Sequence, residues 1–253
     1  MKPILIIRTG RAPDRIRARH GDFPRWFQRA ARLAPGRVRV VDVVAGEALP
    51  APGLAAGAII TGSGAMVTER LDWSERTAGW IRAAMDVELP LFGVCFGHQL
   101  MAHALGGRVD YLPGGREIGT QAITRLAQAV PDDLVGSVTA TFPAHTTHEQ
   151  SVLEPPPGAV VLARSNRDPH QILRYGRHAL STQFHPEFSA EVMRAYVLHK
   201  AAGGARRELQ QLDVFRAVAA TPEARGLLAR FARRAGWTDA RASAAQAARD
   251  GAA

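Results

Sequence analysis

Four short apolar runs without polar alternation stand out in the first hundred residues. They span residues 3–7, 38–44, 57–61 and 90–95, and turn-forming residues bound them. A strand that is buried on both faces needs no polar face, so such runs are typical of a parallel sheet. Between them, residues 23–33 and 74–84 carry apolar side chains at helical spacing. This alternation predicts a three-layer α/β fold, with a mixed, mainly parallel central sheet and flanking helices.

The pattern changes after residue 107, where strand-like segments follow one another with little helix between them. They span residues 109–112, 118–126, 138–142, 160–164, 171–175 and 179–184. We expect them to form antiparallel or mixed sheet that continues the same domain. A helix is predicted over residues 189–199, with Ser189 as its N-cap and Glu191 in its first turn. The main domain is therefore expected to cover residues 1–202.

A smaller piece is predicted at the C-terminal end. Gly203 and Gly204 interrupt the chain, and apolar residues then recur every three positions from Leu209 to Val218. Thr221 and Pro222 have the residue types of an N-cap and a first helical position. Residues 203–238 are thus predicted to form a helical hairpin that packs on the core or on a partner. Residues 239–253 are rich in alanine and lack large apolar side chains, which predicts a disordered tail.

Charge and hydropathy exclude several classes of protein. The formal net charge is +9, but arginine is spread along the chain, and no dense basic run alternates with aromatic residues. Nucleic-acid binding is therefore not expected. No segment approaches the roughly 20 apolar residues that span a bilayer. The apolar run at residues 4–7 is too short for the core of a signal peptide, so a cytoplasmic protein without membrane contact is expected.

The single cysteine stands where an apolar strand meets a predicted helix. Gly93 and Gly97 flank Cys95 two residues away on either side. This is the pattern of a nucleophile elbow, whose sharp turn excludes bulky neighbours. The start of a helix favours a thiolate, and the N–H of Phe96 is placed to hold an oxyanion. The alternative is a buried cysteine beside glycines that serve close packing.

A histidine that could act as the base precedes a proline and a glutamate. Pro186 favours an extended backbone at His185, and residues two apart in an extended segment point to the same side. Glu187 can then hold one ring nitrogen of His185 and leave the other for Cys95. The alternative interpretation is a surface turn.

These two motifs together resemble the class I glutamine amidotransferases. Gly-Val-Cys-Phe-Gly-His-Gln at residues 93–99 and Gln-Phe-His-Pro-Glu at residues 183–187 are most similar to the amidotransferase domain of GMP synthetases and to its free-standing relatives. Residues 60–67 resemble the oxyanion loop of the family. Residues 115–119 resemble its Gly-x-Glu-Ile-Gly strand start, and residues 147–152 resemble a segment near the glutamine site. The resemblance covers about residues 1–200.

The resemblance implies a flavodoxin-like fold and a set of site residues. It implies a catalytic triad of Cys95, His185 and Glu187, without a metal or an organic cofactor. The oxyanion hole would be formed at Phe96 and Gly64, and the implied substrate-binding residues are Gly62, Gln99, His148 and Gln150. The chain departs from the family at Gly64, where proline is common, and at Gln150, where aspartate is frequent.

The implied activity is hydrolysis of the side-chain amide of L-glutamine to glutamate and ammonia. No phosphate-binding loop of the G-x-x-x-x-G-K-[ST] type occurs, so an ammonia acceptor either lies on another chain, such as a synthetase partner, or does not exist. Two alternatives stay open, namely a peptidase or hydrolase of other γ-glutamyl amides and a non-catalytic regulatory subunit. The sequence does not predict the oligomeric state.

Overall fold

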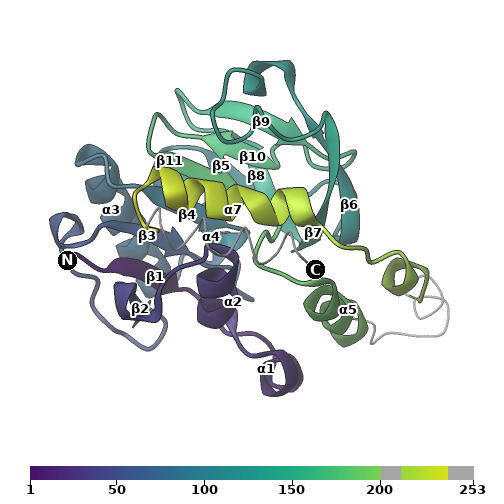
Figure 1. Cartoon of the computed structure of the whole chain (residues 1–253), viewed down its shortest axis with the longest axis horizontal. Helices are drawn as coiled ribbons and strands as arrows, with labels where there is room; N and C mark the ends of the chain where they lie inside the picture. The colour runs from purple at the N-terminus through teal and green to yellow at the C-terminus, as the bar shows by residue number, and fades with distance from the viewer. Residues whose placement is uncertain (201–211, 239–253) are drawn as a thin grey trace, which may run out of the picture.

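The computed structural model describes residues 1–200 and 212–238, and its centre is a sheet of nine strands (Figure 1). The strand order is β2-β1-β3-β4-β11-β10-β9-β6-β7. The first five are parallel, namely β2 (Val38–Asp42), β1 (Ile4–Arg8), β3 (Gly57–Ile60), β4 (Leu91–Val94) and β11 (Ala179–Thr182). The antiparallel strands are β10 (Ile172–Arg174), β9 (Val160–Arg164), β6 (Glu117–Arg125) and β7 (Thr141–His148). A separate antiparallel ribbon pairs β5 (Arg108–Tyr111) with β8 (Gln150–Glu154).

Helices cover both faces of the sheet. One apolar core joins Ile4, Ile6 and Phe92 of the sheet to α1 (Asp14–His20), α2 (Phe23–Ala30), α5 (Ala190–His199) and α7 (Pro222–Arg234). The other joins Leu5, Ile7 and Leu91 to α3 (Asp72–Asp86) and α4 (Phe96–Ala104). Successive side chains of a strand face opposite sides, so each buried parallel strand contributes to both cores. The predicted three-layer α/β fold with a mainly parallel sheet is confirmed.

The C-terminal helix α7 belongs to the first of these cores and runs across the sheet (Figure 1). Phe231 packs edge-on against Phe92, with 5.1 Å between ring centroids, and Trp237 follows at 5.4 Å from Phe231. Pro222 opens the helix as predicted, but the hydroxyl of Thr221 makes no capping hydrogen bond. Of the predicted first helix of the hairpin, residues 212–216 are helical. The remaining predictions, on residues 203–211 and on the tail at 239–253, lie outside the described residues.

Two sequence-based expectations were wrong in detail, and two elements were not predicted. The predicted strand at 138–142 starts later and extends to His148, and β8 was missed, because these strands carry buried polar side chains that interrupt the apolar signal. The short helix α1 was not predicted. The run at 38–44 is not buried on both faces, since β2 is an edge strand and Arg39 and Val40 are exposed. Within the described ranges, no helix is long and apolar enough to cross a membrane.

Candidate active site

Cys95 occupies a strained turn between β4 and α4. Its backbone adopts φ 53° and ψ −104°, a left-handed conformation that is costly for a residue with a side chain. A Cβ on Gly97 would lie 2.4 Å from the carbonyl oxygen of Ile60, and one on Gly93 would lie 2.6 Å from that of Gly97. Both flanking positions therefore require glycine, because strand and helix approach each other too closely for any side chain. The geometry is that of a nucleophile elbow.

His185 lies beside this elbow and is held from two sides. Its Nδ1 is 2.8 Å from Oε1 of Glu187, and both side chains are buried. The phenyl ring of Phe188 stacks on the imidazole with centroids 4.1 Å apart. The ring is therefore fixed in position, as a proton-transfer group requires.

The backbone between His185 and Phe188 does not have the conformation that the sequence predicted. Pro186 and Glu187 form a turn, in which the N–H of Phe188 donates to the carbonyl of His185 at 3.4 Å, so the extended segment predicted here was wrong. The alternative of a surface turn was also wrong, because the residues on both sides of Pro186 are buried. The N–H of His185 donates to the carbonyl of His145 at 2.8 Å, which anchors the turn to β7.

The electrostatics of His185 favour the protonated imidazole. Burial by itself lowers its pKa, but the negative charges of Glu187 and Cys95 and the hydrogen bond to Glu187 raise the pKa to about 10. Its Nε2 is buried and has no hydrogen-bond partner among residues 1–200 and 212–238. The site therefore holds a protonated imidazole close to the cysteine at the elbow.

A cavity of about 60 Å³ opens at Cys95 and gathers most of the predicted site residues. It is lined by Cys95, Phe96, Gly64, Gln99, His148 and Gln150. Gly62 lies beneath the imidazole instead, where a Cβ would be 3.1 Å from Cε1 of His185. Segments that are far apart in the sequence thus meet at one place.

The backbone N–H groups on either side of Phe96 are bonded within the protein. The N–H of Cys95 donates to the carbonyl of Thr182 at 2.9 Å, and that of Gly97 donates to Thr61 at 3.1 Å. The N–H of Phe96 lies between them, at the first position of α4. A hydrogen bond holds the loop that contains Gly62 and Gly64: the hydroxyl of Thr9 donates to the carbonyl of Gly62 at 3.1 Å. Gly64 itself is exposed.

The predicted substrate-binding glutamines are tied into the protein. Nε2 of Gln99 donates to the carbonyl of Gln150 at 2.6 Å and to Oε1 of Gln183 at 2.9 Å. The side chain of Gln150 turns toward Thr68, and its Nε2 donates to that hydroxyl at 2.6 Å. These hydrogen bonds connect both Thr68 and helix α4 to strand β8.

His148 is held by a buried polar network that the sequence did not predict. Its Nδ1 is 2.9 Å from the carbonyl of Gln150, and its Nε2 is 3.0 Å from Oε2 of Glu117. Glu117 also accepts hydrogen bonds from Ser165 and Gln171 at 2.7 and 2.9 Å. Burial raises the pKa of Glu117, but these donors outweigh it and bring the pKa below its ordinary value. An ionised Glu117 therefore fixes the His148 ring at the cavity wall.

Three charged residues of the cavity wall were missed from the sequence. Arg116, Glu149 and Lys200 line the cavity, and Arg116 forms an ion pair with Glu149. Burial lowers the pKa of Lys200, and the neighbouring Arg116 charge lowers it further. Lysine occurs only at positions 2 and 200, which is a signal that could have drawn attention to Lys200.

Comparison with known proteins places the chain in a family. A model described as Glutamine amidotransferase class-I matches residues 49–202, which is more than half of the chain. The chain belongs to the class I glutamine amidotransferase family. The matched region contains residues 60–67, the elbow and both His185 and Glu187, and the match confirms the resemblance inferred from the two motifs.

Curated relatives of two kinds match parts of the chain. Gamma-glutamyl peptidase 5 of Arabidopsis thaliana is 32% identical over 124 residues, which are 48% of this chain and 49% of the peptidase. One subunit of the glutamine-hydrolysing GMP synthase of Methanopyrus kandleri is 36% identical over 106 residues, which are 40% of this chain and 52% of that protein. The chain spans about half the length of these curated relatives.

Solved structures share the amidotransferase fold over almost the whole chain. A glutamine amidotransferase of Thermotoga maritima superposes with a TM-score of 0.68, over 91% of this chain and 98% of its own, at 19% sequence identity. One of Methylobacillus flagellatus gives a TM-score of 0.69, over 92% and 95%, at 21% identity. At these identities the likeness concerns the fold.

Proposed function

We propose that this amidotransferase hydrolyses the side-chain amide of L-glutamine to glutamate and ammonia through Cys95, His185 and Glu187. One observation carries the proposal. The only cysteine of the chain sits in a strained elbow beside a buried His–Glu pair, at a cavity with backbone donors. A purely structural cysteine would not require the left-handed backbone or the two glycines that flank it.

The steps follow from the geometry. The Cys95 thiolate attacks the amide carbon, and the N–H of Phe96 with the loop at Gly64 holds the oxyanion. His185 gives its proton to the leaving nitrogen, so ammonia departs and a γ-glutamyl thioester remains on Cys95. His185 then takes a proton from a water molecule, which hydrolyses the thioester and releases glutamate. Glu187 orients the imidazole and stabilises its charge throughout.

The walls of the cavity fit the charged end of a free amino acid. Arg116 and Lys200 can attract the α-carboxylate, and Glu149 can attract the α-ammonium group. Gln150 is neutral and its Nε2 is bonded to Thr68, so this position offers the ammonium group no opposite charge. A cavity of about 60 Å³ is also far smaller than the 300 to 1,000 Å³ that is typical of sites for drug-sized ligands. A small leaving group such as ammonia fits this restriction.

The second candidate is hydrolysis of other γ-glutamyl amides. The neutral Gln150 favours it, because a site without the usual acidic residue is less strictly built for free glutamine. The likeness to a protein named gamma-glutamyl peptidase supports the same idea. Comparing kcat/KM for glutamine and for γ-glutamyl dipeptides separates the two, since glutamine should be preferred if ammonia is the natural leaving group.

The fate of the ammonia defines the partner. The likeness to a protein named as one subunit of a GMP synthase supports transfer to a synthetase on another chain, rather than simple release. We further propose that residues 1–202 form the catalytic domain and that the C-terminal segment is an attachment to it. Its helix α7 packs on the sheet through Phe231 and so covers one face of that domain.

The decisive experiment is a glutaminase assay with matched variants. Cys95→Ala and His185→Ala should each lose at least about 10³-fold in kcat/KM, because a nucleophile and its base act as a unit. His178→Ala, which removes a histidine ahead of β11 at the opposite end of the strands, should retain the wild-type value. Wild-type activity in Cys95→Ala would refute the proposal.

A further inference from the structure

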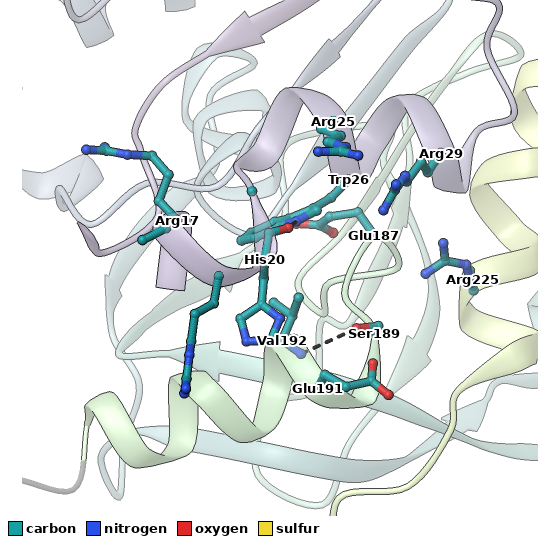
Figure 2. A pocket seen from close by; sticks show the side chains of 13 residues that line it. Arg17, His20, Arg25, Trp26, Arg29, Glu187, Ser189, Glu191, Val192 and Arg225 are labelled. Atoms are coloured by element: carbon teal, nitrogen blue, oxygen red, sulfur yellow. Dashed lines mark hydrogen bonds between the residues drawn. The ribbon is translucent and has the colours of Figure 1, made fainter. Parts of the chain in front are cut away.

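A second and larger cavity lies beside Glu187, on the face of the sheet that α1, α2, α5 and α7 cover. Its volume is about 470 Å³, and α1, α2, the start of α5 and α7 form its walls. Figure 2 shows Arg25 and Arg29, which come from α2, and Arg225, which comes from α7, around Glu187. The volume falls within the range of about 300 to 1,000 Å³ that is typical of small-molecule sites.

The charges of this cavity are unbalanced. Five arginines line it against two glutamates. Arg17 is paired with Asp14 at 2.9 Å, whereas Arg25, Arg29 and Arg225 have no carboxylate within 4.0 Å in the described part of the chain. Burial lowers the pKa of Arg225; the charge of Glu187 opposes this, and the charge of Arg29 adds to it. Guanidinium groups gathered in this way form a ready site for phosphate oxygens.

A ligand of this cavity must also match the carboxylate of Glu187. Its Oε1 is bonded to His185, but its Oε2 is buried and has no hydrogen-bond partner among the described residues. Only 2% of the residue is exposed, so solvent offers little compensation. A fully ionised phosphate cannot donate to a carboxylate oxygen, whereas a sugar hydroxyl can, and acidic side chains bind ribose hydroxyls in this way elsewhere.

We propose that this cavity binds a phosphorylated sugar, either free or as part of a nucleotide. The phosphate lies among Arg25, Arg29 and Arg225, and a hydroxyl donates to Oε2 of Glu187. Because the other oxygen of the same carboxylate holds His185, an occupant of this cavity contacts the residue that orients the imidazole. The site is separate from the cavity at Cys95, and its binding does not depend on the amidase reaction.

Calorimetric titration of the full chain tests the proposal directly. The probes are ribose 5-phosphate, adenosine 5′-diphosphate and inorganic pyrophosphate. One sugar phosphate should bind per chain and more tightly than pyrophosphate, which has no hydroxyl for Glu187. Binding of ribose 5-phosphate alone identifies the free sugar as sufficient, and binding of the nucleotide alone assigns the site to nucleotides.

Variants connect the binding to the cavity. Arg29→Gln and Arg225→Gln should each weaken binding at least about tenfold, since each removes charge-assisted hydrogen bonds. Arg177→Gln, an exposed arginine ahead of β11, is the matched control and should bind as the wild type does. Cys95→Ala should also bind normally, so failure of the proposed amidase leaves this test intact. Absence of saturable binding by both sugar phosphates, or equal losses in Arg177→Gln, would overturn the proposal.

Discussion

The raised pKa of His185 depends in part on the charge of one neighbouring carboxylate, that of Glu187. Glu187→Gln replaces the carboxylate 2.8 Å from Nδ1 by a neutral amide of nearly the same shape. Two unit charges about 4 Å apart interact by about 4 kcal/mol at an effective dielectric constant of 20. This corresponds to about three pH units. The pKa of His185, which is raised to about 10 in the wild type, should therefore fall most of the way to the ordinary value of 6.5.

NMR titration of the histidine ring signals measures this change. Of nine histidines, the signal of His185 is assigned by its loss in His185→Gln. Glu191→Gln is the matched control, because Glu191 lies on the first turn of α5, is exposed and does not contact the imidazole. A His185 midpoint that moves by less than about one pH unit in Glu187→Gln would show that the carboxylate does not control the charge of the imidazole, and would refute the reasoning.

Urea unfolding measures how the elbow glycine, the packing of α7 and the charge of His185 contribute to the stability of the fold. Gly97→Ala should destabilise the fold by at least about 2 kcal/mol, since its Cβ would lie 2.4 Å from the carbonyl oxygen of Ile60. Gly64→Ala is the control: its Cβ would have nothing within 4 Å, and the free energy of unfolding should change by less than about 0.5 kcal/mol. Phe231→Ala should cost about 3 to 5 kcal/mol, because it empties the contact between α7 and the sheet. The raised pKa of His185 stabilises the folded chain fully below about pH 6.5, and this contribution is lost as the pH rises through about 10. The advantage of the wild type over Glu187→Gln should shrink over that interval, and a constant difference would contradict it.

The parallel half of the fold could be predicted from the sequence because its strands are apolar on both faces. The elbow was equally predictable, since a sharp turn between strand and helix needs glycine at two fixed positions. The apolar pattern did not predict β7 and β8 correctly, because these strands carry buried polar residues such as His148 and Gln150, which lie at the candidate site. Edge position is also invisible in a local pattern, so β2 was taken for a strand buried on both faces.

The candidate site could be predicted through its motifs but not through its supports. Cys95, His185 and Gln99 stand in recognisable local patterns, whereas the Glu117 carboxylate meets His148 only because β6 and β7 pair in a particular register. The cavity beside Glu187, which five arginines line, corresponds to no sequence motif. Arg29 and Arg225 are almost two hundred positions apart, and only the packing of α7 on α2 brings them to the same cavity.

The most direct test of the central claim is detection of the covalent intermediate. The chain is mixed with glutamine, quenched in acid during turnover and analysed by mass spectrometry of the intact protein and of its peptides. Formation of a γ-glutamyl thioester on the peptide that carries Cys95, with ammonia released in step, is the predicted result. Production of glutamate without an adduct on Cys95, or with an adduct on another residue, would contradict the account.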